Sequence, residues 1–207
     1  MSHAGQRLTV TFRNASRVFC RARRRCSHSQ SALGFFQLAS LLRFENPSEL
    51  LAQISEAIES PELRDFLQAI NSPNSFLETA KCDTWITGDL DVEEEIFGAA
   101  LKSASYIDLV AASHEVRCVF EKHEEFLRKL VGLLQRIPEI PAAAEFILRR
   151  CYFQDHDSVQ EGYYVTFYLS GYGDEDLEAR QHWAIGLALV KNAILQLSAQ
   201  LRPRSET

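Results

Sequence analysis

The sequence predicts an all-α fold: a single helical-bundle domain of about six to eight helices behind a basic N-terminal leader that is disordered or amphipathic. Three observations predict it. Apolar residues recur at helical spacing along most of residues 45–207. Pro, Ser, Asn and Asp stand where these helices would begin. One segment has strand character, but no second segment of that kind accompanies it.

Charge divides the chain into two parts. Residues 1–44 contain eight Arg and no Asp, Glu or Lys, whereas residues 45–207 carry all 28 acidic residues against 14 basic ones. The formal charges are therefore +8 and −14, which sum to −6. Such asymmetry is typical of a targeting segment or tail joined to a globular body. We therefore predict a leader outside the fold, residues 1–44, and one acidic helical domain, residues 45–207.

The leader has the composition of an organelle transit peptide, which is Arg-rich, contains Ser and lacks acidic residues. Placed on a helix, residues 7–24 separate into an apolar and a basic side. We predict mitochondrial (matrix) localisation, with processing near Ser27. Two alternatives stay open: translation from a GC-rich region upstream of the true start, which would make the protein cytoplasmic, or a surface helix that binds anionic lipid. The apolar side holds Leu8, Phe12, Ala15 and Phe19, and the basic side Arg13, Arg17, Arg21 and Arg24.

The first body helices are short and antiparallel. Asn46 or Ser48 can cap a helix that ends near Ser60. Pro61 then begins a second helix, because proline is tolerated in the first helical turn, and residues 71–73 (Asn-Ser-Pro) stop it. Residues 82–89 are predicted to be a loop.

Two longer helices follow. Asp89 or Asp91 caps a helix that runs to about Ala112, and the acidic run 93–95 suits its first turn because the helix dipole favours negative charge there. The next helix begins at Ser113 and carries an apolar stripe to Leu134. Pro138 and Pro141 interrupt the chain, after which residues 142–152 are predicted to be helical.

The segment Tyr163–Leu169 is the hardest to assign. Its aromatic and β-branched residues favour a strand, and Gly171 and Gly173 close it. An isolated strand cannot satisfy its backbone, however, so we predict a buried helix. The final helix begins at residues 174–176 and should be the central element, since residues 183–190 are apolar almost all round.

Several classes of function are disfavoured by composition and motifs. No run of 18 apolar residues could form a transmembrane segment, and an acidic body opposes binding to the nucleic-acid backbone. Five widely spaced cysteines favour a reducing compartment. Phosphate-binding, dinucleotide-binding, nucleophile-elbow, zinc-protease and EF-hand signatures do not occur. We therefore predict no catalytic residue and no cofactor.

Weaker constellations remain. His114, Cys118 and Glu121 share one face of a predicted helix and could approach a divalent ion, but surface helices collect such residues by chance, so we predict no metal. His123 lies in the apolar stripe of that helix and is interpreted as a hydrogen-bonded core histidine. Residues 155–157 (Asp-His-Asp) are interpreted as a polar turn. Glu178 and His182 are four residues apart and could contribute to a di-metal bundle, but such a bundle needs the motif Glu-x-x-His twice and the chain has neither copy.

The densest aromatic cluster lies near the end of the chain. Tyrosine is common where a surface is dry on one side and wet on the other, as at interfaces. We therefore treat the cluster as a candidate interface, with core packing as the alternative. Its members are Tyr163, Tyr164, Phe167, Tyr168 and Tyr172.

These features favour a non-catalytic helical protein-interaction module, such as an assembly factor, adaptor or accessory subunit, whose partners are other proteins. The oligomeric state stays open. The alternative is a helical-bundle enzyme, or a protein that binds a small ligand or metal, with a pocket near Tyr163–Tyr172 lined by Tyr163, Tyr168, His156 or His182. The first predicts partner-dependent stability, and the second a stoichiometric ligand.

Overall fold

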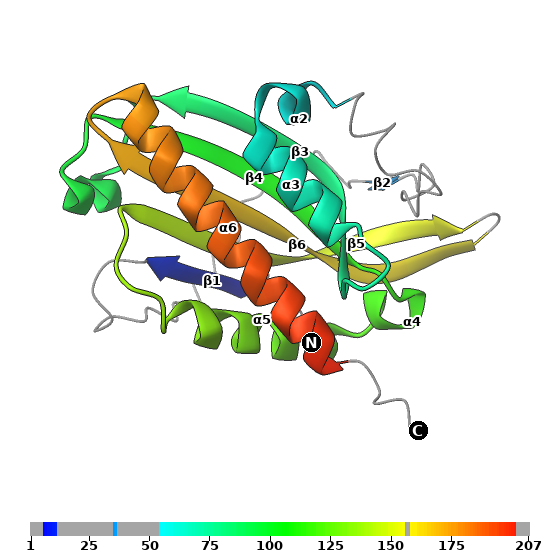
Figure 1. The fold of residues 1–207 in the computed structure, drawn as a ribbon. Helices are drawn as coiled ribbons and strands as arrows, with labels where there is room; N and C mark the ends of the chain where they lie inside the picture. The colour runs from blue at the N-terminus through cyan, green and yellow to red at the C-terminus, as the bar shows by residue number, and fades with distance from the viewer. Residues whose placement is uncertain (1–5, 12–34, 37–53, 156–157, 202–207) are drawn as a thin grey trace.

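A computed structural model describes residues 6–11, 35–36, 54–155 and 158–201. In this part of the chain six strands form one sheet: five are antiparallel to their neighbours in the order β1-β5-β6-β4-β3, and the sixth, β2, pairs parallel with β5 (Figure 1). The all-α prediction is therefore wrong, and the molecule is a mixed α/β fold rather than a helical bundle. The strands are β1 (Gln6–Thr11), β2 (Phe35–Phe36), β3 (Leu77–Thr87), β4 (Leu101–Ala111), β5 (Ala142–Asp155) and β6 (Ser158–Gly173).

The observed helices agree with the sequence prediction better than the strands do. The predicted helix that starts at Pro61 is confirmed as α3, whose N-cap Ser60 accepts a hydrogen bond from the Leu63 amide. The predicted final helix is confirmed as α6, and the helix predicted from Ser113 is divided into α4 and α5. The bounds are α2 (Ser55–Glu59), α3 (Pro61–Ile70), the 3₁₀ helix η1 (Val92–Phe97), α4 (His114–Arg117), α5 (Phe120–Leu134) and α6 (Asp176–Leu201).

Four predicted assignments are wrong, because segments predicted to be helices or a loop are strands. Residues 82–89 belong largely to β3, residues 142–152 to β5, and Tyr163–Leu169 lies within β6. The helix predicted to end near Ala112 is η1 followed by β4. β4 is a central strand buried on both faces, so its sequence lacks clean alternation. The partners that the strand Tyr163–Leu169 needed are therefore β4 and β5, two of these misassigned segments.

Two parts of the predicted leader pair with β5. Residues 7–11, expected to start a helix, lie in β1, where Leu8 is opposite Phe146. Phe35 and Phe36 pair with the far end of β5 as β2. The remainder of the predicted leader helix, residues 12–24, lies outside the described residues.

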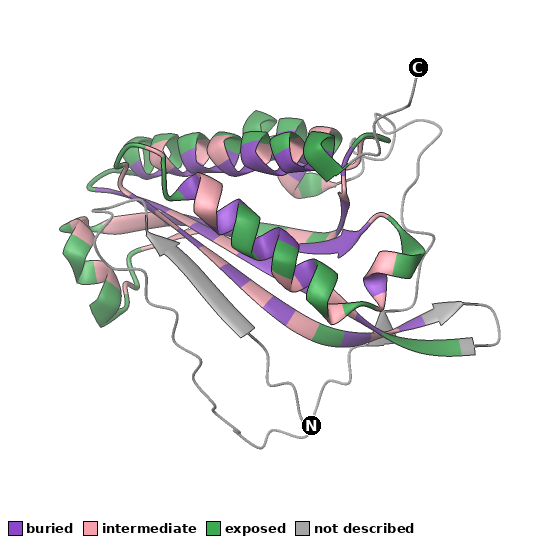
Figure 2. Ribbon diagram, turned by 90° about the horizontal axis from the view of Figure 1, so that it is seen from below, coloured by how far each residue is buried: buried purple, intermediate pink, exposed green. Residues whose placement is uncertain are grey.

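The core lies between the sheet and the layer formed by α3, α5 and α6. Figure 1 shows α6 lying diagonally across the strands, and in Figure 2 the buried stripes of α5 and α6 are turned toward the sheet. Phe167 of β6 is at the centre: its ring lies 4.9 Å from that of Phe146 and 6.0 Å from that of Phe66 on α3. Trp183 of α6 donates its Nε1–H to Ser105 Oγ at 2.9 Å.

One helix, α6, is long and apolar enough to cross a membrane by length and composition alone. Its buried residues include Trp183, Leu187, Val190 and Ile194, and they join the cluster that contains the strand residues. α6 thus packs on the sheet as a core helix does. Core helices can also be long and apolar enough to meet this criterion.

Candidate functional site

The sheet has two faces of different character. Side chains alternate along each strand, and one set, including Ile107, Phe146 and Val165, packs against α3, α5 and α6. We call the opposite side the open face. Of the described helices, η1 and α4 contact it, one at each end: Phe97 of η1 stacks on Tyr172, and Arg117 of α4 lies over Phe153.

A row of aromatic side chains crosses the middle of the open face. Trp85 of β3, Tyr106 of β4 and Tyr168 of β6 lie on neighbouring strands, with successive ring centroids 6.4 and 6.3 Å apart and tilted rings. The Lys81 ammonium lies 5.4 Å from the centroid of the Tyr106 ring, within cation–π range. Trp85 is 39% exposed although it is large and apolar. We call Trp85, Tyr106 and Tyr168 the aromatic row.

A polar network lies beside the row. The Thr166 hydroxyl donates to Asp108 at 2.8 Å, and Arg149 Nε donates to the Thr166 oxygen at 2.9 Å. Asp108 and Thr166 are both buried, and burial raises the pKa of the Asp108 carboxyl. Because its polar groups are bonded to one another, this network stabilises the floor of the face.

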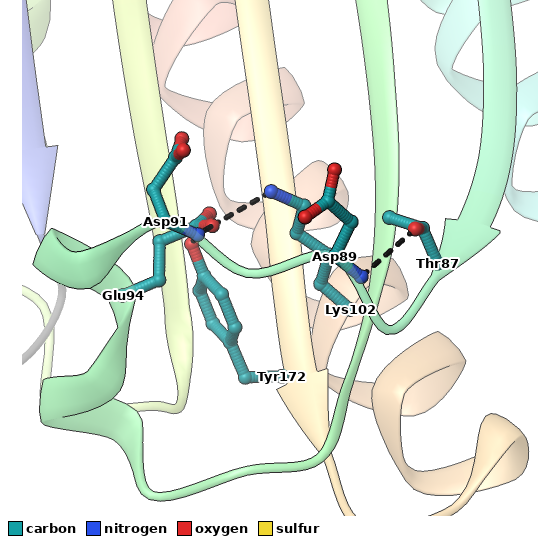
Figure 3. Close-up of polar contacts among 6 residues, drawn as sticks. All are labelled: Thr87, Asp89, Asp91, Glu94, Lys102 and Tyr172. Atoms are coloured by element: carbon teal, nitrogen blue, oxygen red, sulfur yellow. Dashed lines mark hydrogen bonds and ion pairs between the residues drawn. The ribbon is translucent and has the colours of Figure 1, made fainter.

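One end of the open face is closed by η1 (Figure 3). Glu94 binds the Lys102 ammonium and the Tyr172 hydroxyl, each at 2.7 Å, and Phe97 stacks on the Tyr172 ring with centroids 3.9 Å apart. Burial opposes ionisation of Glu94, but the bonds from Lys102 and Tyr172 outweigh it and hold the pKa of this carboxyl below its usual range. Burial and the neighbouring carboxylate raise the pKa of Tyr172. We call these four residues the η1 latch.

The latch fixes a loop that is otherwise exposed. The Asp91 amide donates to Glu94 at 2.7 Å in a capping box, so the acidic run lies in a first helical turn as predicted, although the helix is short and 3₁₀. Gly98 ends η1 with φ of 62°, a left-handed conformation that glycine adopts without strain. The loop presents Val92, which is 79% exposed, among carboxylates.

The predicted interface cluster is divided between the two faces. Phe167 is in the core, and Tyr163 faces the helices, where its ring meets Phe120 of α5 edge-on at 5.4 Å. Tyr164, Tyr168 and Tyr172 belong to the open face, because they alternate with those two along β6. Of the cluster, Tyr168 lies in the aromatic row and Tyr172 in the latch.

The weak metal candidates do not share one helix. His114 lies in α4, and Cys118 is the C-cap residue of that helix. Glu121 lies in α5, which begins after its N-cap residue Val119. Within residues 54–155 and 158–201, where side chains are largely described, no three His, Cys, Asp or Glu side chains are placed to hold a metal ion.

The predicted histidines have separate environments. His123 is buried, as predicted, and Nδ1–H donates to the Val119 carbonyl at 3.0 Å, while Nε2 has no partner. His182 of α6 bonds the Tyr172 carbonyl at 2.6 Å, and Glu178 accepts from the Asp174 amide. His156 and Asp157 lie outside the described residues, as does the Asp155 side chain. Tyr163 and Tyr168 face opposite sides of the sheet, so these two residues do not line one pocket.

The sequence prediction missed Trp85, Tyr106, Asp108 and Arg149, since each lay in a segment assigned to a loop or helix. Residues 84–87 (Thr-Trp-Ile-Thr) are β-branched and aromatic, and this is the signal that could have identified β3. β3 pairs with β4, which in turn pairs with Tyr163–Leu169, so recognising β3 would have shown that this segment is not the only strand candidate in the chain.

Comparisons of the chain with protein-family models, curated proteins and solved structures find no match. The geometry of the open face therefore carries the functional argument.

Proposed function

We propose that this chain is a non-catalytic protein-interaction module that binds a partner protein through the open face. The aromatic row is the observation that carries the proposal. Aromatic side chains supply much of the binding energy of protein interfaces, because they bury large apolar areas and lose little conformational entropy. Trp85, half-exposed at the margin of the row, has the character of such an anchor residue.

The β3 edge of the sheet is a poorer docking surface than the open face. β3 is one of the two edge strands, and a partner strand would need its unpaired amides. The Thr79 amide already donates to Asn71 Oδ1 at 2.9 Å, and the Thr84 amide donates to Asp83 at 2.8 Å. A bulge near Lys81 also interrupts the register. These are the devices by which natural edges avoid strand addition.

The polar contacts of the open face support a binding role over a catalytic one. Glu94 is paired with Lys102 and Tyr172, and Asp108 is bonded to Thr166. A general acid, base or nucleophile must reach a substrate, whereas these groups are engaged with the protein itself.

Site-specific photo-crosslinking tests the proposal. A photoreactive phenylalanine analogue is placed at position 85 and, in a separate full-length variant, at position 185 on the outer side of α6. Ile185 is the matched control because it is 47% exposed and lies away from the sheet. We expect protein adducts in the cells that make the protein from position 85 but not from position 185.

Mitochondrial matrix localisation remains our proposal, supported by the basic, acid-free composition of residues 1–44. Cleavage near Ser27 would remove β1, which pairs with β5. Intact mass and the N-terminal residue of the endogenous protein in fractionated cells test this directly. Import predicts a start near Ser27 in the mitochondrial fraction, whereas a start at Met1 in the cytosol would refute it.

A further inference from the structure

The rings and charges of the open face indicate which chemical class of partner it would bind; this inference rests on the proposed function. The face already holds one cation against a ring, since the Lys81 ammonium lies 5.4 Å from the Tyr106 centroid. Among the described residues, no cation lies over the rings of Trp85 or Tyr168 in the same row. Trp is the ring that attracts cations most strongly, and Arg is the cation found most often over it.

The charge beside the row is negative. Residues 88–100 contain five acidic residues and no Lys or Arg. Glu94 is paired with Lys102, while the other four are exposed: Asp89, Asp91, Glu93 and Glu95. The latch fixes this loop next to the row, because Lys102 and Ala104 lie on the same face of β4 and Ala104 is the cross-strand partner of Trp85.

A surface between the latch and the row could receive the apolar part of a partner. The small side chains of Ala104 on β4, Ser170 on β6 and Ala143 on β5 stand side by side in the register; Ala104 is buried, and the other two are half-buried. Tyr106 and Tyr168 border this strip on one side, and Tyr172 with Phe97 on the other. The strip leads to Trp85 at the β3 margin.

We propose that the open face binds a basic, partly apolar segment of a partner protein, whose Arg or Lys side chains stack on Trp85 and Tyr168 and pair with the η1 carboxylates. Complementary charge would speed encounter and select this class of partner. Aromatic rows on sheet faces also bind single-stranded nucleic acid. Here the adjacent carboxylates would repel phosphates, so the charge favours the peptide.

Isothermal titration calorimetry on the full chain tests the proposal with three probes: a short peptide of alternating Arg and Leu, the same peptide with Glu in place of Arg, and single-stranded oligothymidylate. We expect only the Arg peptide to bind. Trp85→Leu should weaken its binding by roughly 2- to 5-fold, the effect of one exposed cation–π contact. Glu93→Gln with Glu95→Gln should weaken binding and reduce its dependence on salt.

Matched variants separate docking from general attraction to an acidic protein. Ile185→Ala controls for Trp85→Leu, and Glu121→Gln with Glu125→Gln on α5 controls for the η1 pair, since all these residues are exposed. Equal weakening in the controls, or equal binding of the Glu peptide or the oligonucleotide, would overturn the proposal. If the Arg peptide does not bind but position 85 still crosslinks to a protein, the basic partner is refuted and the proposed function stands. Absence of crosslinks at position 85 would refute both.

Discussion

The buried environment of His123 predicts that the stability of the protein depends on pH. Its side chain is 1% exposed, and its Nδ1–H is donated to the Val119 carbonyl, so Nε2 is a buried acceptor without a donor. Protonation would place a charge and a second N–H in the core with no acceptor. Burial accordingly lowers the pKa of His123, despite the opposing hydrogen bond to Val119.

The lowered pKa predicts a loss of stability on acidification. Above the unfolded-state pKa of about 6.5, His123 is neutral in both states and adds no pH dependence. Below it the unfolded chain binds a proton that the folded chain refuses, so the unfolding free energy should fall by up to about 1.4 kcal/mol per pH unit, until the folded pKa is reached. Urea denaturation at a series of pH values measures this slope. His123→Leu should remove the His123 contribution, and exposed His114→Leu should not; equal slopes in both variants would contradict the account.

At the residue scale the sequence predicted the burial of one side chain correctly, but it did not predict the direction in which the strand side chains point. His123 was correctly expected in the core because its neighbours in the helical stripe are apolar. The tyrosines of β6 form one cluster in the sequence analysis because they are the densest group of aromatic residues in the chain. On a strand, Tyr163 and Tyr164 point to opposite faces of the sheet. Residues that are neighbours in the sequence therefore belong to different surfaces.

At the element scale α3 and α6 could be predicted because each carries local signals. Ser60 and Pro61 mark the start of α3, and α6 is long and apolar. The strands could not be assigned in the same way, because their evidence is non-local. In β4, Leu101, Ala104, Ile107 and Val110 recur every three residues and imitate a helix. Only pairing with β3 and β6 determines that this segment is a strand.

Contact between α6 and β6 predicts an intolerant glycine. A Cβ added to Gly171 would overlap the backbone of Trp183 and Ala179, which cannot move without shifting α6. We expect Gly171→Ala to destabilise the fold by about 1–3 kcal/mol or more. Gly132 is the control: a Cβ there meets nothing within 4 Å, and Ala should stabilise α5 by about 0.5–1 kcal/mol. Urea denaturation followed by circular dichroism compares the two. Equal stability of both variants would show that α6 does not seat on Gly171.

At the scale of the whole molecule the two faces of the sheet have different surroundings, and we propose that they have different roles, one in stability and the other in binding a partner. One face is packed under α3, α5 and α6 and forms the core, while the other carries the aromatic row between η1 and α4. The sequence alone shows that the body is acidic and that it carries no standard catalytic motif. It could not predict the open face, because that face joins two strand pairs, β3–β4 and β5–β6, that lie apart in the sequence.

The measurement that tests the central claim most directly is the yield of protein adducts from a photoreactive side chain at position 85 relative to position 185. Both native residues are large, apolar and exposed, and they lie on opposite sides of the molecule, on β3 and α6. The account predicts abundant adducts with a partner protein at position 85 and few at position 185. Equal yields at the two positions, or adducts at position 185 alone, would show that the open face is not the binding surface.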